Sequence, residues 1–202
     1  MAKQLLYFWI KKILTTDIGI RVLSRYLIYR VCKDTPRKLI KKKGESSVLV
    51  LSPERFLQSE IQDLSDRGPI NIFFLDKQLL HLVINIVWNH SVPLAATLEP
   101  NTSSYDRELL QSNRGMLREL YSRLLPILFR RFRIKAVVGS APHYSWNHDF
   151  GAIASKMGIP YVILMKECLI TNQRHYDRIV NFYSKMEQGA IDHVVVYNRS
   201  AE

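Results

Sequence analysis

The sequence predicts an α/β fold with a doubly wound, mostly parallel sheet. Short apolar runs alternate with longer segments of helical periodicity, which is typical of strand–helix–strand units. The clearest unit is 134–167, where apolar runs at 136–138 and 161–164 flank one helix-period stretch. Gly158 suits the left-handed end of that helix, and Pro160 cannot continue it. Strands this apolar are expected to be buried on both faces of a parallel sheet.

The other elements follow the same alternation along the chain. The predicted strands are 48–51, 71–75, 136–138, 161–164 and 193–197. The predicted helices, beyond the one before Gly158, are 54–66, 78–89, 106–131 (with a kink expected at Pro126) and 173–188, and 93–104 is expected to be irregular. A chain of 202 residues is long enough for one sizeable core, so we expect a single α/β domain over 44–202.

The positive charge is concentrated in one segment. The whole chain has a formal net charge of +11, and residues 1–43 carry twelve Lys and Arg against two Asp. The rest of the chain is therefore close to neutral. Nucleic-acid-binding domains more often spread basic residues over a folded face, and no nucleic-acid motif is present, so we expect no nucleic-acid partner.

Residues 1–43 also carry apolar residues at helical spacing, Trp9 among them, which indicates a basic amphipathic helical segment. Lys11, Lys12 and Asp17 interrupt it before the ~20 apolar residues that a membrane span needs. Such a segment either lies on an anionic membrane surface or packs on the domain with its charges solvated. The two distant cysteines, Cys32 and Cys168, are typical of a cytoplasmic protein. We therefore expect a cytoplasmic protein that can attach peripherally to the inner face of the membrane.

Several familiar chemistries lack their motifs. The chain has no GxGxxG, no P-loop and no GxSxG sequence, so we expect no tightly bound cofactor and no hydrolase nucleophile. His143 and His148, with Asp149 beside the second, could ligate a metal. Without Cys ligands or an HExxH sequence, we favour no metal site.

Polar and aromatic residues follow two of the predicted strands. In parallel sheets, ligands gather at the carboxyl ends of the strands. The loop 139–148 follows the strand 136–138, and Lys166 and Glu167 follow the strand 161–164. These groups are expected to lie at one edge of a crevice, where the loop's aromatic side chains could stack on sugar rings. The alternative is that the loop is an ordinary solvated turn.

The order of these motifs resembles a known family. A strand is followed by Gly139-Ser140, a loop with His and aromatic residues, a helix, Met157-Gly158-Ile159-Pro160, a strand and Lys166-Glu167, and the pattern closes with 192–200. This resembles the N-terminal half of GT-B glycosyltransferases, especially those of bacterial surface and capsular polysaccharide biosynthesis and their CDP-glycerol transferase and epimerase-like relatives. The resemblance covers 48–202 and implies a single Rossmann-like domain on the acceptor side of a glycosyltransferase.

The resemblance also implies the substrates. The donor would be a nucleotide sugar, held mainly by a C-terminal domain, and the acceptor a carbohydrate or a lipid-linked sugar. The sequence ends at Glu202, where these enzymes pass into their second domain. We therefore expect the chain to lack that partner domain, and to transfer sugar only when one completes it.

By the same resemblance, the loops after three strands would line the cleft. The implied substrate-binding residues are Ser52, Arg55, Gly139, Ser140, Tyr144 and Lys166, and the implied catalytic residues are His143, His148 and Glu167. A histidine would act as the general base on a hydroxyl acceptor, because imidazole titrates near neutrality. Glu167 would accept hydrogen bonds from sugar hydroxyls, and Lys166 would meet a donor phosphate or pair with Glu167.

Two other functions stay open. One is a non-catalytic, membrane-associated domain that binds a carbohydrate or a protein partner through the same crevice. The other is a flavodoxin-like domain that binds phosphate or a nucleotide, with Gly139-Ser140 as the anion site at a helix N-terminus.

Overall fold

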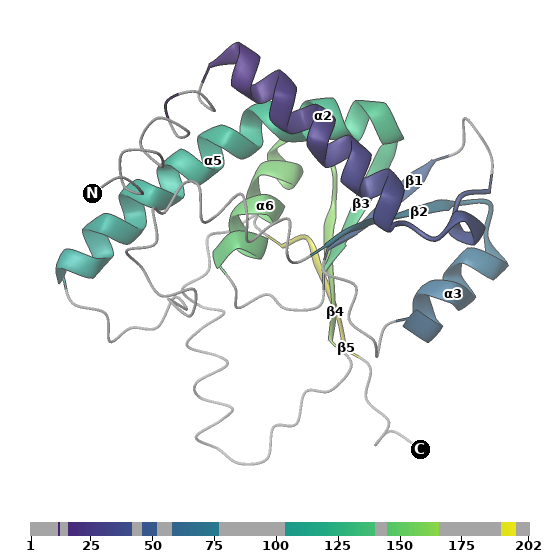
Figure 1. The fold of residues 1–202 in the computed structure, drawn as a ribbon. Helices are drawn as coiled ribbons and strands as arrows, with labels where there is room; N and C mark the ends of the chain where they lie inside the picture. The colour runs from purple at the N-terminus through teal and green to yellow at the C-terminus, as the bar shows by residue number, and fades with distance from the viewer. Residues whose placement is uncertain are drawn as a thin grey trace, which may run out of the picture.

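The computed structural model describes residues 12, 16–41, 46–51, 58–76, 104–139, 145–165 and 191–196. Within these ranges, five strands form one sheet: β1 (Ser47–Leu51), β2 (Asn71–Leu75), β3 (Ile134–Gly139), β4 (Tyr161–Met165) and β5 (His193–Val196). Their order is β2-β1-β3-β4-β5, and every neighbouring pair is parallel (Figure 1). The predicted α/β class with a parallel sheet is confirmed.

The described helical elements are α2 (Asp17–Asp34), a 3₁₀ turn η1 (Arg37–Leu39), α3 (Gln58–Arg67), α5 (Ser104–Phe132) and α6 (Ser145–Lys156). α5 continues through Pro126 over 29 residues. The predicted helices 78–89 and 173–188 lie outside the described residues, as does 93–103 of the predicted irregular segment.

Local sequence signals explain where two of these helices begin or end. The side chain of Thr16 accepts a hydrogen bond from the Gly19 amide at 3.1 Å, which caps α2 at its first turn. After α6, Gly158 adopts φ 72°, the left-handed conformation expected from the sequence. The chain then enters β4 directly after Pro160.

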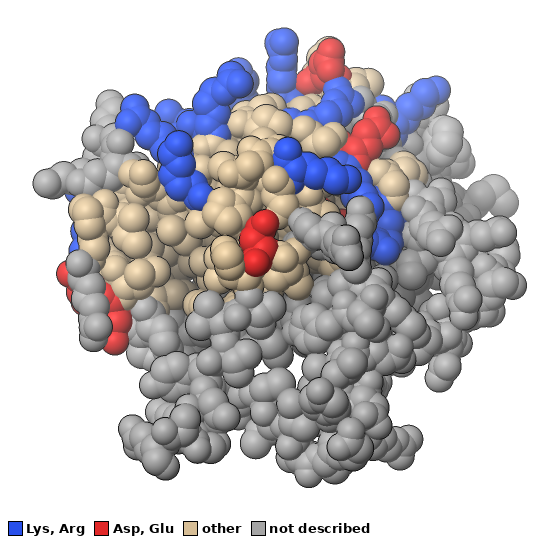
Figure 2. Space-filling view, turned by 180° about the vertical axis from the view of Figure 1, so that it is seen from behind, with Lys and Arg blue, Asp and Glu red and all other residues tan. Residues whose placement is uncertain are grey.

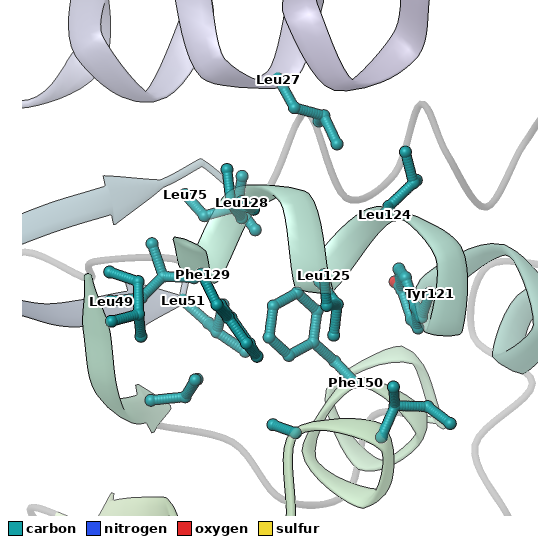
Figure 3. Close-up of a cluster of buried hydrophobic side chains, with 14 of the residues drawn as sticks. Leu27, Leu49, Leu51, Leu75, Tyr121, Leu124, Leu125, Leu128, Phe129 and Phe150 are labelled. Atoms are coloured by element: carbon teal, nitrogen blue, oxygen red, sulfur yellow. The ribbon is translucent and has the colours of Figure 1, made fainter. Parts of the chain in front are cut away.

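Apolar side chains cover both faces of the sheet. On one face, α2, α5 and α6 pack against residues such as Leu49, Leu51 and Val137 (Figure 3). On the other face, Val50 and Ile72 pack with Leu39 of η1 and Ile61 of α3. Helical elements on both faces make the sheet doubly wound, so the fold is Rossmann-like.

α2 is part of this core. Leu27 and Val31 on its inner face belong to the same cluster as Leu124 and Leu128 of α5, and Figure 1 shows α2 crossing over α5. One face of α2 therefore packs on the domain. None of the helices in the described ranges has an apolar stretch long enough to cross a bilayer.

Candidate functional site

The strand order of the sheet reverses between β1 and β3. β1 lies between β2 and β3, so the chain leaves β1 towards one side of the sheet and leaves β3 towards the other. Ligands in open α/β sheets bind outside the carboxyl ends of the strands at such a point. Among the predicted site residues, Gly139 and His148 are described. The others lie outside the described residues: Ser52, Arg55, Ser140, His143, Tyr144, Lys166 and Glu167.

His148 lies in a helix, which corrects the sequence interpretation. The loop after β3 was expected to run to residue 148, but α6 begins at Ser145. The helical periodicity before Gly158 therefore extends further upstream than the polar composition of 145–148 indicated. As a result, His148 and Asp149 face the interior near the start of α6, with 2% and 0% of their surface exposed.

α5 reaches the same edge of the sheet. It connects to β3 through Arg133, which has a positive φ of 52° and turns the chain back. At 1.5 Å per residue, Arg118 lies about 21 Å along α5 from Phe132, and β3 spans about 17 Å from Ile134 to Gly139. The N-terminal half of α5 is thus level with the carboxyl end of β3.

Two arginines of α5 hold the buried carboxylate of Asp149. Arg114 donates from Nε to both oxygens, at 3.2 and 3.1 Å, and from Nη2 to Oδ1 at 2.8 Å. Arg118 Nε donates to Oδ1 at 2.7 Å. Burial by itself raises the pKa of Asp149, but contacts with His148, Arg114 and Arg118 outweigh it and lower the pKa to about 2. The carboxylate is therefore charged at any physiological pH.

Two neighbours of His148 Nδ1 favour opposite tautomers of the ring. Its Nδ1 lies 3.2 Å from Arg114 Nη2 and 3.7 Å from Asp149 Oδ1. A hydrogen bond from His148 to Asp149 needs the proton on Nδ1. Because arginine can only donate, the contact with Arg114 instead needs Nδ1 as the acceptor, with the proton of a neutral ring on Nε2. Nε2 is buried and has no hydrogen-bond partner in the described structure. In this tautomer His148 offers a donor, whereas a general base needs a free lone pair at that nitrogen.

Two tyrosines add buried hydroxyls beside this ion pair. Tyr121 of α5 and Tyr161 of β4 are 2% and 0% exposed, and within the described ranges neither hydroxyl has a hydrogen-bond partner. Burial raises the pKa of Tyr161. Burial, the charge of Asp149 and Tyr161 all raise the pKa of Tyr121, so Asp149 and Tyr161 both lie near it. Both hydroxyls stay protonated and can donate.

Tyr161 also explains Gly139. A Cβ at Gly139 would collide with the Tyr161 hydroxyl oxygen and would lie 3.1 Å from the adjoining ring carbon. The Tyr161 hydroxyl therefore occupies the space at the end of β3 that a side chain at position 139 would need. This brings Tyr161, which lies at the start of β4, towards the carboxyl edge of the sheet.

We call these six residues the Asp149 cluster: Arg114, Arg118, Tyr121, His148, Asp149 and Tyr161. It combines two positive charges with one negative charge and three buried donors that lack a described partner. A buried donor without a partner costs about 1–3 kcal/mol, so such groups usually meet a water molecule or a ligand oxygen. The chemistry suits an oxygen-rich ligand such as a sugar or a phosphate. Within the described part of the chain, no three His, Cys, Asp or Glu side chains gather as metal ligands.

Sequence reasoning missed most of this cluster. Asp149 was considered only as a metal ligand and Tyr161 only as a strand residue. Arg114, Arg118 and Tyr121 were not considered, although their i, i+4, i+7 spacing places them on one face of a predicted helix. A repeated polar face on an otherwise buried helix is the signal that could have found them.

Comparison with protein-family models, with curated proteins and with solved structures found no match to this chain. The structure establishes an α/β domain with a parallel, Rossmann-like sheet.

Proposed function

We propose that the chain is the acceptor-side domain of a GT-B-type glycosyltransferase that acts in cell-surface polysaccharide or glycolipid biosynthesis. The observation that carries the proposal is the set of three buried donors, on Tyr121, Tyr161 and His148, at the carboxyl edge of a parallel sheet. Sugar hydroxyls accept hydrogen bonds from such donors, and the order of motifs in the sequence resembles that family.

The roles of the residues follow from their chemistry. Tyr121, Tyr161 and His148 Nε2 would donate to the acceptor sugar, and Arg114 would hold His148 in the donating tautomer. The predicted general-base role of His148 needs the other tautomer, in which Nδ1–H donates to the Asp149 carboxylate and Nε2 has a free lone pair. His143, Glu167, Lys166, Tyr144, Ser140, Ser52 and Arg55 remain predicted cleft residues. A nucleotide sugar would be the donor, bound mainly by a second domain.

A second candidate is the flavodoxin-like phosphate or nucleotide site. The strand order β2-β1-β3-β4-β5 is that of flavodoxin-like domains, and the cluster has one more positive than negative charge. Both observations favour an anion near the start of α6. In the non-catalytic alternative, the same site binds a carbohydrate but no sugar is transferred.

One titration separates these functions. The protein, labelled with ¹³C in tyrosine and ¹⁵N in histidine, is titrated with methyl glycosides, inorganic phosphate and cytidine diphosphate. A sugar that shifts the Tyr121, Tyr161 and His148 signals supports the glycan-binding proposal. Phosphate or nucleotide that alone shifts them supports the flavodoxin-like alternative, and no shift with any probe contradicts both. Transfer of labelled sugar from a nucleotide donor to a lipid-linked acceptor, assayed with the chain joined to a donor-binding domain, then distinguishes part of an enzyme from a binding domain.

A further inference from the structure

Helix α2 has two apolar faces, and the fold uses one of them. The inner face carries Ile20, Leu23, Leu27 and Val31, each at most 6% exposed. On the opposite face, Ile18, Val22, Tyr26 and Tyr29 are 74%, 62%, 39% and 58% exposed. The outer four are spaced 4, 4 and 3 residues apart, so they form one stripe about 16 Å long.

The outer stripe does not contribute to the core. The inner face alone packs on α5 and the sheet, so polar residues at 18, 22, 26 and 29 would serve folding equally well. Scattered exposed apolar residues are common, but a continuous stripe on one helix face usually marks an interaction surface.

Basic residues flank this stripe. Arg21, Arg25 and Lys33 are exposed on α2, and Arg37, Lys38 and Lys41 follow it on the surface. Both acidic residues of α2 are engaged by arginines: Asp17 accepts from Arg123 at 2.6 Å, and Asp34 pairs with Arg30 at 3.0 Å. Figure 2, which views the molecule from the side opposite to that of Figure 1, shows further Lys and Arg side chains over the upper part of the described surface.

We propose that the outer face of α2 docks on the surface of an anionic lipid bilayer. Tyrosines suit the boundary between headgroups and acyl chains, because the ring is apolar and the hydroxyl polar. Ile18 and Val22 would enter the acyl boundary, while the flanking Arg and Lys side chains would meet lipid phosphates. The bilayer is favoured over a protein partner because the basic residues lie along the whole stripe, as an extended anionic surface requires. This inference does not depend on the proposed function.

The test uses point variants, because deleting 1–43 would remove Leu27 and Val31 from the core. The intact chain is co-sedimented with phosphatidylcholine vesicles that do or do not contain phosphatidylglycerol. Binding is expected only with the anionic lipid and is expected to weaken at about 0.5 M salt. Arg21→Gln with Arg25→Gln should weaken binding by about fivefold per arginine, and Val22→Ser with Tyr29→Ser should weaken it by at least about tenfold.

Matched controls come from other surfaces. Arg130→Gln with Arg131→Gln removes two exposed arginines of α5, and Leu64→Ser replaces an exposed leucine of α3 (46% exposed). These controls should bind like the unchanged chain, and thermal melting should show that every variant is folded. The proposal is overturned if the unchanged chain does not bind anionic vesicles, or if both α2 variants bind them as tightly as the controls do. Sedimentation velocity tests the alternative that this face binds a second copy of the chain. That alternative holds if the unchanged chain is a dimer that does not bind vesicles and the α2 variants are monomers.

Discussion

Arg114 of α5 donates hydrogen bonds to both carboxylate oxygens of Asp149 in α6. Its Nε lies 3.2 Å from Oδ1 and 3.1 Å from Oδ2, and its Nη2 lies 2.8 Å from Oδ1. The same Nη2 reaches Nδ1 of His148 at 3.2 Å. One guanidinium of α5 therefore contacts both side chains of α6.

Asp149→Asn should destabilise the protein by about 3 kcal/mol, because it leaves the charges of Arg114 and Arg118 partly buried without their anion. Urea unfolding at neutral pH measures this change. Asp66→Asn is the matched control, since Asp66 is an exposed residue that accepts one hydrogen bond from Gln62. It should change stability by less than about 0.5 kcal/mol. Equal, small effects of the two substitutions would mean that the buried pair contributes little.

Acid should weaken the fold through the same carboxylate. The pKa of Asp149 is lowered from 3.8 to about 2 in the folded protein, so the folded state favours the charged form. Its contribution, about 2 kcal/mol, is fully present above pH about 4 and is lost as the pH falls towards about 2. Urea unfolding across this range should show the loss in the unchanged chain and a smaller one in Asp149→Asn. Parallel pH profiles of the two proteins would contradict the lowered pKa.

Glycine substitutions should separate packing from helix propensity. Gly139→Ala should destabilise by about 1–3 kcal/mol, because its Cβ collides with Tyr161. In a Tyr161→Phe background the loss should be smaller, since the hydroxyl oxygen is the nearest atom. Gly115 lies at an exposed position of α5, where an added Cβ meets no atom within 4 Å, so Gly115→Ala should instead stabilise the protein by about 0.5–1 kcal/mol. A Gly139→Ala variant as stable as the unchanged chain would show that Tyr161 can move away from β3.

His148 should carry its proton on Nε2. Long-range ¹H–¹⁵N spectra distinguish the two ring nitrogens, and slow exchange of the Nε2 proton with water is expected because that atom is buried. A proton found on Nδ1 would contradict the contact with Arg114. It would also leave a lone pair on Nε2, as the predicted general-base role requires.

The sequence predicted the sheet better than the site. Short apolar runs such as 71–75 fit a buried strand, so their composition and length were enough to predict the strands. The glycine and proline after α6 were enough to predict where that helix ends. The pairing of Arg114 with Asp149 joins residues 35 positions apart and depends on how α5 packs against α6. No local pattern encodes that contact. His148 was noticed for its chemistry but was assigned to a loop, because polar residues at a helix start resemble a turn.

The most direct test of the central claim, that the buried donors of the Asp149 cluster serve a ligand, compares stability with binding in Tyr121→Phe and Tyr161→Phe. Each substitution removes a buried hydroxyl that has no partner in the described structure, so the free protein should be as stable as before or more stable. Binding of the sugar identified by titration should weaken by about tenfold, while Tyr29→Phe on the surface changes neither property. A marked loss of stability with unchanged sugar binding in both variants would contradict the account and assign the two hydroxyls to the core.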